Sequence, residues 1–399
     1  MIGVIGAEQA VAFDVRVHDS VREIAQDVWD ACFTDEAESW AYYAATEAAL
    51  LPGFTWCYFA VRERGQVIAV APAFITEYRL DTTIQGRVKQ LLRPLLAVLR
   101  PALTLRLLCL GSPVADICHL GFSATLTFTA RGEVAACLLR AFETYATSRG
   151  IGLLAAKDMV DDVLAGPVGA AFVAAGYARQ PSLPNAVLDV RYSDLNGYLA
   201  ALSTATRRDI RRKLRVRHEV QVERRYGRQA LELVTEILRL YDAQRARSNV
   251  DFEQFETLTP EYFRQVLLEH EGALVFVYRD RGGDRRSIAG FNFCYHSARV
   301  FVDKFIGLDQ PRAGELNLYV LSWINNVEYC IEQRIATLQS GQTGYSMKRR
   351  LGSRLVPSSL LFRHRNRGLN VVLRAAGPLL AANRYDKIEP VARNDGGRR

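Results

Sequence analysis

The chain has 399 residues, of which 49% are hydrophobic and 24% charged, a balance that indicates a globular protein and excludes a disordered one. This length exceeds what one ordinary hydrophobic core serves, so two domains are expected. The net charge of +8 is uneven: residues 1–185 hold 15 Lys/Arg against 19 Asp/Glu, whereas residues 186–399 hold 36 against 24. We therefore expect an anionic partner to meet the second half of the chain.

The cysteines and histidines suggest neither a disulfide framework nor a metal site. The seven cysteines are an odd number and include no C-x-x-C pair, and the six histidines show no metal-ligand spacing. The N-terminal "MIGVIGAEQAVAF" is apolar, but it lacks a basic leader and reaches Glu8 early, so it is a poor signal peptide. A cytoplasmic location is predicted.

Residues 88–111 are apolar but carry too many arginines and prolines to span a bilayer. On a helical wheel, Lys89, Arg93 and Arg100 share one side of residues 88–100, and the leucines and Val98 cover the other. This pattern is typical of a helix that lies at a membrane interface, here the inner membrane face. The alternative is a surface helix that covers the core of its own domain.

The first half of the chain alternates strand and helix signals. "WCYFAVRERGQVIAVAPAFITEY" (56–78) reads as a β-hairpin with Gly65 in the turn. The other expected elements are a strand at 12–17, a helix at 20–32, a helix at 133–149 that ends at Gly150, a strand at 150–159, and a helix, turn and strand over 170–190. The loop at 180–185, with two prolines, is the best domain boundary.

The second half repeats this order. Helices are expected at 195–202, 205–217 and 229–247, a three-strand meander at 272–309, a helix at 314–332, a strand at 335–339, a helix at 345–350 and a strand at 358–363. Helices, an antiparallel meander and then helix–strand, occurring twice, indicate two α+β domains. We predict domains at 1–185 and 186–383, followed by a polar, disordered tail at 384–399.

Three stretches resemble the Fem-like branch of the GNAT acyltransferase superfamily, whose members include peptidoglycan-bridge enzymes. They are "GYARQPSLPNAVLDV" (176–190), "LNGYLAALSTATRRDIRRKLR" (195–215) and "GQTGYSMKRRLGS" (341–353), and the resemblance covers residues 12–375. It implies two tandem GNAT-like domains, each a mixed, largely antiparallel sheet flanked by helices. It also implies an acyltransferase. Because no Ser/His/Asp or Cys/His arrangement is legible in the sequence, we expect direct attack without a covalent enzyme intermediate, with backbone N–H groups of 288–308 stabilising the oxyanion.

The resemblance leaves the co-substrates open. Acyl-CoA is the usual donor of the superfamily and the one we expect. Its acyl group would pass to an amine or hydroxyl of a small molecule or cell-wall precursor. Aminoacyl-tRNA, which the bridge enzymes use, would suit the positive second half. A third alternative is a degenerate, non-catalytic GNAT fold that binds an anionic partner.

The resemblance places the pyrophosphate of the donor at the loop "GLDQPRAGELNLY" (307–319), where a strand leads into a helix. Gln310, Arg312, Ala313 and Gly314 stand at the signature positions. Glu315 departs from the signature, because it adds a negative charge where phosphate would bind.

Three residues of "GQTGYSMKRRLG" stand where GNAT chains meet the leaving group. Tyr345 and Lys348 lie three apart and share a helical face. Tyr345 could protonate a leaving thiolate or alkoxide, and Lys348 or Arg350 could hold a phosphate or carboxylate. The alternative is a basic surface turn with a packed tyrosine.

Asp303 in "RVFVDKFIG" is the candidate general base. Strand periodicity puts Phe301, Asp303 and Phe305 on one face, with Lys304 on the other. A carboxylate between phenylalanines has a raised pKa unless it is paired, and a raised pKa suits a base that deprotonates an amine. Asn292 on the adjacent strand could bind substrate. The alternatives are a structural ion pair and a core amide.

The stretch "STATRRDIRRKLR" (203–215) reads as a surface helix with Thr206 as N-cap and a narrow apolar edge at Ile210 and Leu214. Its arginines at i and i+4 repel one another, and an anionic ligand would relieve that repulsion. The candidate substrate-binding residues are Arg207, Arg208 and Arg211. Carboxylates of a neighbouring segment, or solvent alone, are the alternatives.

Overall fold

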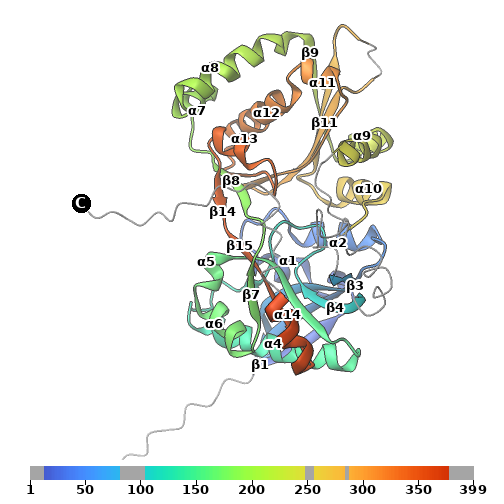
Figure 1. Ribbon diagram of the computed structural model, residues 1–399, viewed down its shortest axis with the longest axis vertical. Coiled ribbons are helices and arrows are strands. Elements are labelled where there is room, and N and C mark those ends of the chain that lie inside the picture. Colours follow the sequence, from blue (N-terminus) through green and yellow to red (C-terminus); the bar gives the residue numbers. More distant parts are fainter. Residues whose placement is uncertain (1–12, 81–103, 248–255, 284–286, 377–399) are drawn as a thin grey trace, which may run out of the picture.

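The computed structural model describes residues 13–80, 104–247, 256–283 and 287–376, which form two β-sheets flanked by helices (Figure 1). Both sheets are mixed and largely antiparallel, as the sequence predicts. Residues 88–100 and 384–399, for which an interfacial helix and a disordered tail are predicted, lie outside the described residues. No helix in the described part of the chain is long and apolar enough to cross a membrane.

The first sheet has the strand order β1-β2-β3-β4-β6-β15-β7, with β5 paired to β3. Its strands are β1 (Phe13–His18), β2 (Thr55–Glu63), β3 (Gln66–Arg79), β4 (Thr104–Leu110), β5 (Gly121–Phe122), β6 (Leu153–Val160), β7 (Ala178–Pro181) and β15 (Ser358–His364). Helices α4 (Ala130–Ser148), α5 (Asp161–Leu164) and α6 (Pro167–Ala174) cover one face, and α1 (Gln26–Asp30) and α2 (Trp40–Ala48) lie on the other. The predicted hairpin is β2–β3.

The second sheet has the order β14-β8-β13-β12-β11-β10-β9. Its strands are β8 (Asn185–Asp189), β9 (Val220–Tyr226), β10 (Leu274–Asp280), β11 (Gly290–His296), β12 (Val300–Leu308), β13 (Thr337–Gln339) and β14 (Arg354–Val356). Its helices are α7 (Leu195–Ala201), α8 (Thr204–Lys213), α9 (Val234–Arg247), α10 (Pro260–Glu269), α11 (Arg312–Glu315), α12 (Leu318–Gln333) and α13 (Tyr345–Arg350). The predicted meander is β10–β12, but the edge strand β9 was not predicted.

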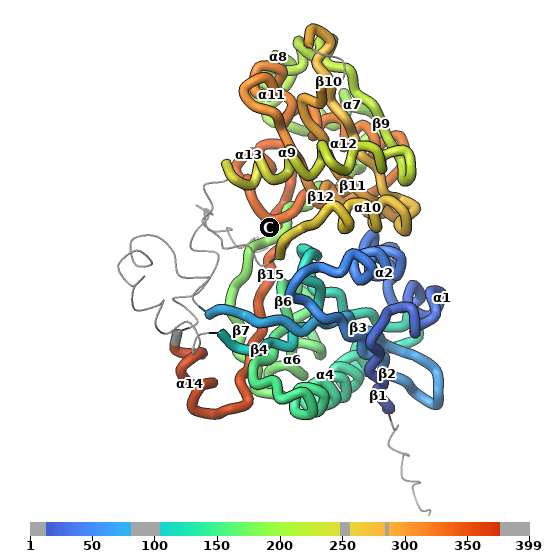
Figure 2. Tube along the Cα trace, turned by 90° about the vertical axis from the view of Figure 1, so that its right-hand side faces the viewer, coloured from blue at the N-terminus to red at the C-terminus, as the bar shows by residue number. Residues whose placement is uncertain are grey.

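One apolar core joins the two domains. Helix α10 of the second domain packs against α2 of the first (Figure 2). Aromatic side chains of the two domains lie together beside these helices. Tyr42 and Tyr295 have ring centroids 5.2 Å apart, and both rings are fully buried. The faces that carry α2 and α10 therefore meet along a dry, aromatic boundary.

The chain crosses between the sheets twice. It leaves the first sheet after β7 and enters the second at β8, where the sequence analysis places its boundary. It then returns, because β15 pairs antiparallel with both β6 and β7. The prediction that the strand at 358–363 belongs to the second domain is therefore wrong. The apolar pattern of a strand shows that it is buried but not which sheet buries it.

A β-bulge interrupts β12. Phe293 pairs with Phe305 and Cys294 with Asp303, so Lys304 is the extra residue between them. The bulge turns Lys304 and Phe305 to the face of α9 and α10, whereas Phe301 and Asp303 face α12. The prediction that Phe305 shares the face of Asp303 is therefore wrong, because strict alternation fails at a bulge.

Helix α8 begins at Thr204, one residue before the predicted start at residue 205. Ser203, not Thr206, is its N-cap, and the Ser203 hydroxyl accepts the backbone N–H of Thr206 at 3.2 Å. Ile210 is buried and Leu214 packs beside it, as the apolar edge predicts.

The return of β15 gives a testable consequence for stability. Leu361, on β15, is 3% exposed in the core between the first sheet and α4. Leu361→Ala should lower the free energy of unfolding by about 2–4 kcal/mol, because it opens a cavity in that core. Hydrogen exchange should accelerate at β6 and β7 of the first sheet. Equal acceleration at β10 and β11 would contradict the assignment, and the exposed Leu369→Ala serves as control.

Candidate functional site

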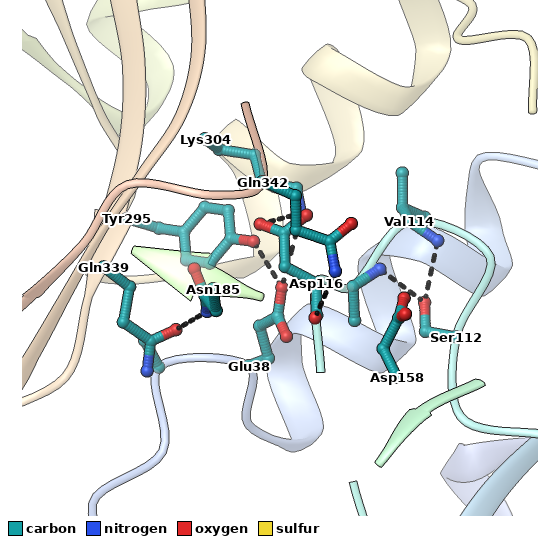
Figure 3. A network of polar contacts seen from close by, with 12 residues as sticks. Glu38, Ser112, Val114, Asp116, Asp158, Asn185, Tyr295, Lys304, Gln339 and Gln342 are labelled. Carbon is teal, nitrogen blue, oxygen red and sulfur yellow. Dashed lines mark hydrogen bonds and ion pairs between the residues drawn. The ribbon is translucent and has the colours of Figure 1, made fainter. Parts of the chain in front are cut away.

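A cluster of buried polar side chains lies where the two domains meet (Figure 3). The Lys304 ammonium from the bulge lies 3.2 Å from the Asp116 carboxylate and 3.8 Å from that of Glu38. The Tyr295 hydroxyl donates a 2.7 Å hydrogen bond to Glu38. Lys304 and Tyr295 belong to the second domain, whereas Glu38 and Asp116 belong to the first. The cluster is thus complete only when the domains are packed together.

Glu38 stands just before α2, and its side chain is 6% exposed. Burial raises the pKa of its carboxyl to about 7, because desolvation and the nearby charge of Asp116 outweigh the ammonium of Lys304 and the Tyr295 hydrogen bond. A carboxyl with a pKa near neutrality can both take up and release a proton at physiological pH. Glu38 is therefore the best-placed general base in the cluster.

A buried histidine extends the cluster on the far side of Glu38. His119 Nε2 lies 3.4 Å from Glu38 Oε2, and its Nδ1 lies 2.7 Å from the Tyr43 hydroxyl. Desolvation lowers the pKa of His119, so the ring is neutral at pH 7. With the tautomer that this pattern favours, the Tyr43 O–H donates to Nδ1 and the Nε2–H faces Glu38.

A second cation comes from β6 of the first domain. Lys157 Nζ lies 3.0 Å from Asp158 and donates a 2.7 Å hydrogen bond to the backbone carbonyl of Ala115. Desolvation lowers the pKa of Lys157, but attraction to Asp158 outweighs it and raises the pKa above its usual value. Asp158 has a positive φ of 56°, a strained conformation for a residue other than glycine. The strain lies where β6 and β15 lose register, beside the cluster.

The cluster also lies where two strands of the second sheet separate. The parallel strands β12 and β13 pair only through Val300–Val302, whereas β12 continues to Leu308. The chain after β13 turns toward the first domain, where Gln342 Nε2 donates to the Asp116 carbonyl at 3.2 Å. The separation begins at Asp303 and Lys304, whose side chains lie on opposite faces of the sheet.

Asp303 belongs to a different group of polar residues, on the face that packs against α12. Asn292 Nδ2 donates a 2.9 Å hydrogen bond to Asp303 Oδ1, and Lys348 and Asn326 are close enough to influence the carboxyl. Desolvation raises the pKa of Asp303 to about 6, although the charge of Lys348 and the two amides oppose it. The structure thus brings Asp303, Asn292 and Lys348 together, as a separate group from that of Glu38.

Of the three residues predicted to contact the leaving group, two lie in the core and one on the surface. Tyr345 is 6% exposed, and its hydroxyl donates a 2.9 Å hydrogen bond to the Pro184 carbonyl. Lys348 is also buried and donates to the carbonyls of Ser340 and Gly341. Arg350 is on the surface, 3.4 Å from Asp209 of α8. Both buried residues thus hold the loop between β13 and α13.

The predicted pyrophosphate loop folds as a closed turn. The N–H groups of Ala313, Gly314 and Glu315 donate to carbonyls of Asp309 or Pro311, within the loop itself. Arg312 contacts the carboxylates of Asp280 and Glu315 at 2.6 and 2.8 Å. Gln310 packs against Gly314, where an added Cβ would approach its side chain to 3.0 Å. The amides and the guanidinium here are already engaged inside the protein.

The arginines of α8 form an exposed cationic surface. Asp209 contacts Arg212 at 2.6 Å and Lys213 at 3.0 Å. Arg207 donates to the Ala200 carbonyl at 3.2 Å. The exposed Arg208 and Arg211 of α8, and Arg215 just after its end, form no ion pair with a described residue.

Sequence reasoning missed Glu38, Asp116, His119 and Lys304. Glu38 and Lys304 are far apart in the chain, and only the packing of two domains brings them together. A signal did exist for Lys304, since a lysine inside an otherwise apolar strand needs a partner. No group of three or more His, Cys, Asp or Glu among the described residues has the arrangement of a metal site.

Comparison with solved structures identifies the fold. FemX is 12% identical, with 90% of this chain and 100% of FemX covered and a TM-score of 0.60. The DUF2156 C-terminal domain of a protein assigned as a lysylphosphatidylglycerol synthetase from Agrobacterium fabrum is 16% identical, with 91% and 98% covered and a TM-score of 0.51. A tandem GNAT protein from the clavulanic acid biosynthesis pathway is 11% identical, with 88% and 98% covered and a TM-score of 0.51.

No family model matches the sequence, and no curated protein matches it either. The structural likeness is therefore one of fold. The chain has the tandem GNAT fold, as the resemblance implied.

The raised pKa of Glu38 predicts how stability depends on pH. Between pH 4.5, its ordinary value, and about pH 7, the folded chain keeps a proton that the unfolded chain has released. The contribution of Glu38 to stability is therefore present at low pH and is lost as the pH rises through 7, by up to about 3 kcal/mol. Glu38→Gln should remove this loss, so the variant should gain stability relative to wild type between pH 5 and pH 8.

Urea unfolding at both pH values measures the difference. A variant-to-wild-type difference that is the same at pH 5 and pH 8 would contradict the assigned pKa. Glu332→Gln, at an exposed ion pair with Arg224, is the control and should show no such trend.

Proposed function

We propose that this protein is an acyltransferase that transfers an acyl group to an amine at the cluster between its two domains. The tandem GNAT fold supports the reaction class. The observation that carries the proposal is Glu38, a buried carboxyl with a pKa of about 7, within 3.8 Å of an ammonium, where β12 separates from β13. Such a group suits proton abstraction from an ammonium-type acceptor near neutral pH.

In the proposed reaction, the acceptor nitrogen attacks the carbonyl carbon of the donor and passes a proton to Glu38. The Lys304 ammonium stabilises the negative oxygen of the tetrahedral intermediate, together with backbone N–H groups of the separated strands. The C–N bond is formed in this attack; the intermediate then collapses as the carbonyl double bond re-forms and the bond to the leaving group breaks. Glu38 then returns the proton to the leaving thiolate or alkoxide, which restores the starting state.

The neighbours of Glu38 have positioning roles in this proposal. The Tyr295 hydroxyl fixes one carboxylate oxygen, and the His119 ring lies beside the other. Asp116 holds the Lys304 ammonium at 3.2 Å, so the cation points to the cluster before substrate arrives. Preorganised charges of this kind need no rearrangement during the reaction.

The donor is a thioester or an ester, and two candidates follow. Acyl-CoA is the donor expected from the resemblance, with Gln310, Arg312, Ala313 and Gly314 at its pyrophosphate. The closed turn and the ion pairs of Arg312 weigh against that loop, since its amides and guanidinium already have partners. Aminoacyl-tRNA is the second candidate, supported by the exposed arginines of α8. A small molecule or a cell-wall precursor is the proposed acceptor class.

The catalytic assignment distinguishes Glu38 from Asp303, two carboxylates on opposite faces of the same sheet. Glu38→Gln should lower kcat/KM a hundredfold or more, because general-base catalysis contributes on the order of 10²–10⁴. It should also abolish the fall in kcat/KM below about pH 7 that the ionisation of Glu38 imposes on wild type. Asp303→Asn should keep that pH profile.

Lys304 provides a matched pair of variants for the same assay. Lys304→Met should lose about a hundredfold in kcat, as removal of one oxyanion-stabilising group does, whereas Lys304→Arg should retain part of the activity. Near-UV circular dichroism checks that each variant is folded. If Asp303→Asn loses the pH dependence and Glu38→Gln keeps it, the base is Asp303 and the assignment fails.

The two donors can be separated with Arg208, Arg211 and Arg215. Replacing all three with glutamine should weaken use of aminoacyl-tRNA about tenfold or more. It should also flatten the salt dependence, because with fewer phosphate contacts fewer counterions are released on binding. Turnover with acyl-CoA should not change. Offering charged tRNAs and acyl-CoAs to the wild-type protein measures both. If the protein consumes neither donor at any concentration, the result would favour the non-catalytic binding module.

A further inference from the structure

Helix α14 (Arg367–Ala376), which follows β15, presents an apolar face that no other described element covers. Leu373 is 8% exposed and anchors the helix on the first sheet. Leu369, Val371 and Val372 are 47%, 66% and 61% exposed, although side chains of this kind are normally buried. At 100° per residue, these side chains, with Ala375, form one continuous apolar arc.

The polar flank of α14 is positive. Residues 365–376 carry Arg365, Arg367 and Arg374 and no carboxylate, and none of the three forms an ion pair with a described residue. By wheel position, Arg367 and Arg374 lie side by side, opposite the apolar arc. An apolar arc bordered by arginines is the composition of a helix that lies in the plane of an anionic membrane surface.

The surface beside α14 extends the positive charge. The Arg365 backbone N–H donates to the Gly152 carbonyl at 2.9 Å, and Arg106 donates to the Arg149 carbonyl at 2.9 Å. The α14 start, the β4 start and the end of α4 therefore meet at one end of the first sheet. Figures 1 and 2 place α14 at the end of the molecule remote from the second domain. Nearby Glu143 already pairs with Arg363.

We propose that α14 docks the protein onto a bilayer rich in anionic phospholipid, with Leu369, Val371 and Val372 inserted among the acyl chains and the arginines against phosphate groups. Charge complementarity favours this occupant over a second copy of the chain, because two such faces would bring six arginines together. The interaction does not depend on the proposed transferase activity.

Co-sedimentation of the full-length protein with vesicles tests the proposal. Phosphatidylcholine vesicles that contain phosphatidylglycerol should bind the wild-type protein, and phosphatidylcholine alone should bind it far more weakly. Val371→Glu/Val372→Glu should lower the partition coefficient tenfold or more, because two charges replace the inserted side chains. Arg365→Gln/Arg367→Gln/Arg374→Gln should lower it on the order of a hundredfold.

Phe128→Glu is the matched control. Phe128 is 68% exposed near the N-terminal end of α4, about 28 Å of helix away from the Arg149 end, so its replacement should leave binding unchanged. Thermal unfolding checks that each variant is folded.

Three outcomes of the vesicle assay would overturn the proposal. They are absence of wild-type binding to the anionic vesicles, equal loss of binding in Phe128→Glu, and unchanged binding in the Val371/Val372 variant. A dimer in sedimentation velocity that Val371→Glu/Val372→Glu dissociates would also overturn it, in favour of a second copy on this face.

Discussion

The contact between Lys304 and the carboxylates of Glu38 and Asp116 constrains the rest of the structure. A lysine cannot be buried at a domain boundary without opposite charge near it, and here the charge comes from the other domain. Each domain alone would leave these charges unpaired or exposed. The electrostatic requirement and the aromatic boundary of α2 and α10 therefore fix the same relative position of the two domains.

The bulge in β12 determines which ionisable side chains take part in this contact. It divides two neighbouring ionisable residues between the two faces of one sheet, Asp303 toward α12 and Lys304 toward the first domain. These two residues stand where β12 leaves β13, because the parallel pairing ends at Val302. A carboxyl of raised pKa therefore lies on each face of the sheet at this point, Glu38 on one and Asp303 on the other.

Local patterns in the sequence predicted much of the fold. The hairpin β2–β3, the meander β10–β12 and helix α13 follow from alternation, turn residues and spacing, which are properties of neighbouring residues. The resemblance carried by 195–215 and 341–353 led to the correct fold. Strand β9 was not predicted, because its charged residues, such as Arg224 and Arg225, obscure the alternating pattern of an edge strand.

The site was predicted less well, because it depends on long-range geometry. Asp303 and Asn292 could be paired from adjacent strands, and the structure brings them to 2.9 Å. Glu38 lies in a short loop with no motif around it, and its importance arises from burial that only the second domain provides. The pairing of β15 was hidden for a similar reason, since two sheets compete for any apolar strand.

The position of β15 has a consequence for synthesis on the ribosome. Domains usually fold as units, from the N-terminus onward, while the chain is still being made. In this protein the first sheet lacks the strand between β6 and β7 until residues 358–364 have left the exit tunnel. A truncated product would expose two open strand edges, which are sites of aggregation and of recognition by chaperones. The strand order thus lets the first sheet close only in chains that extend past residue 364.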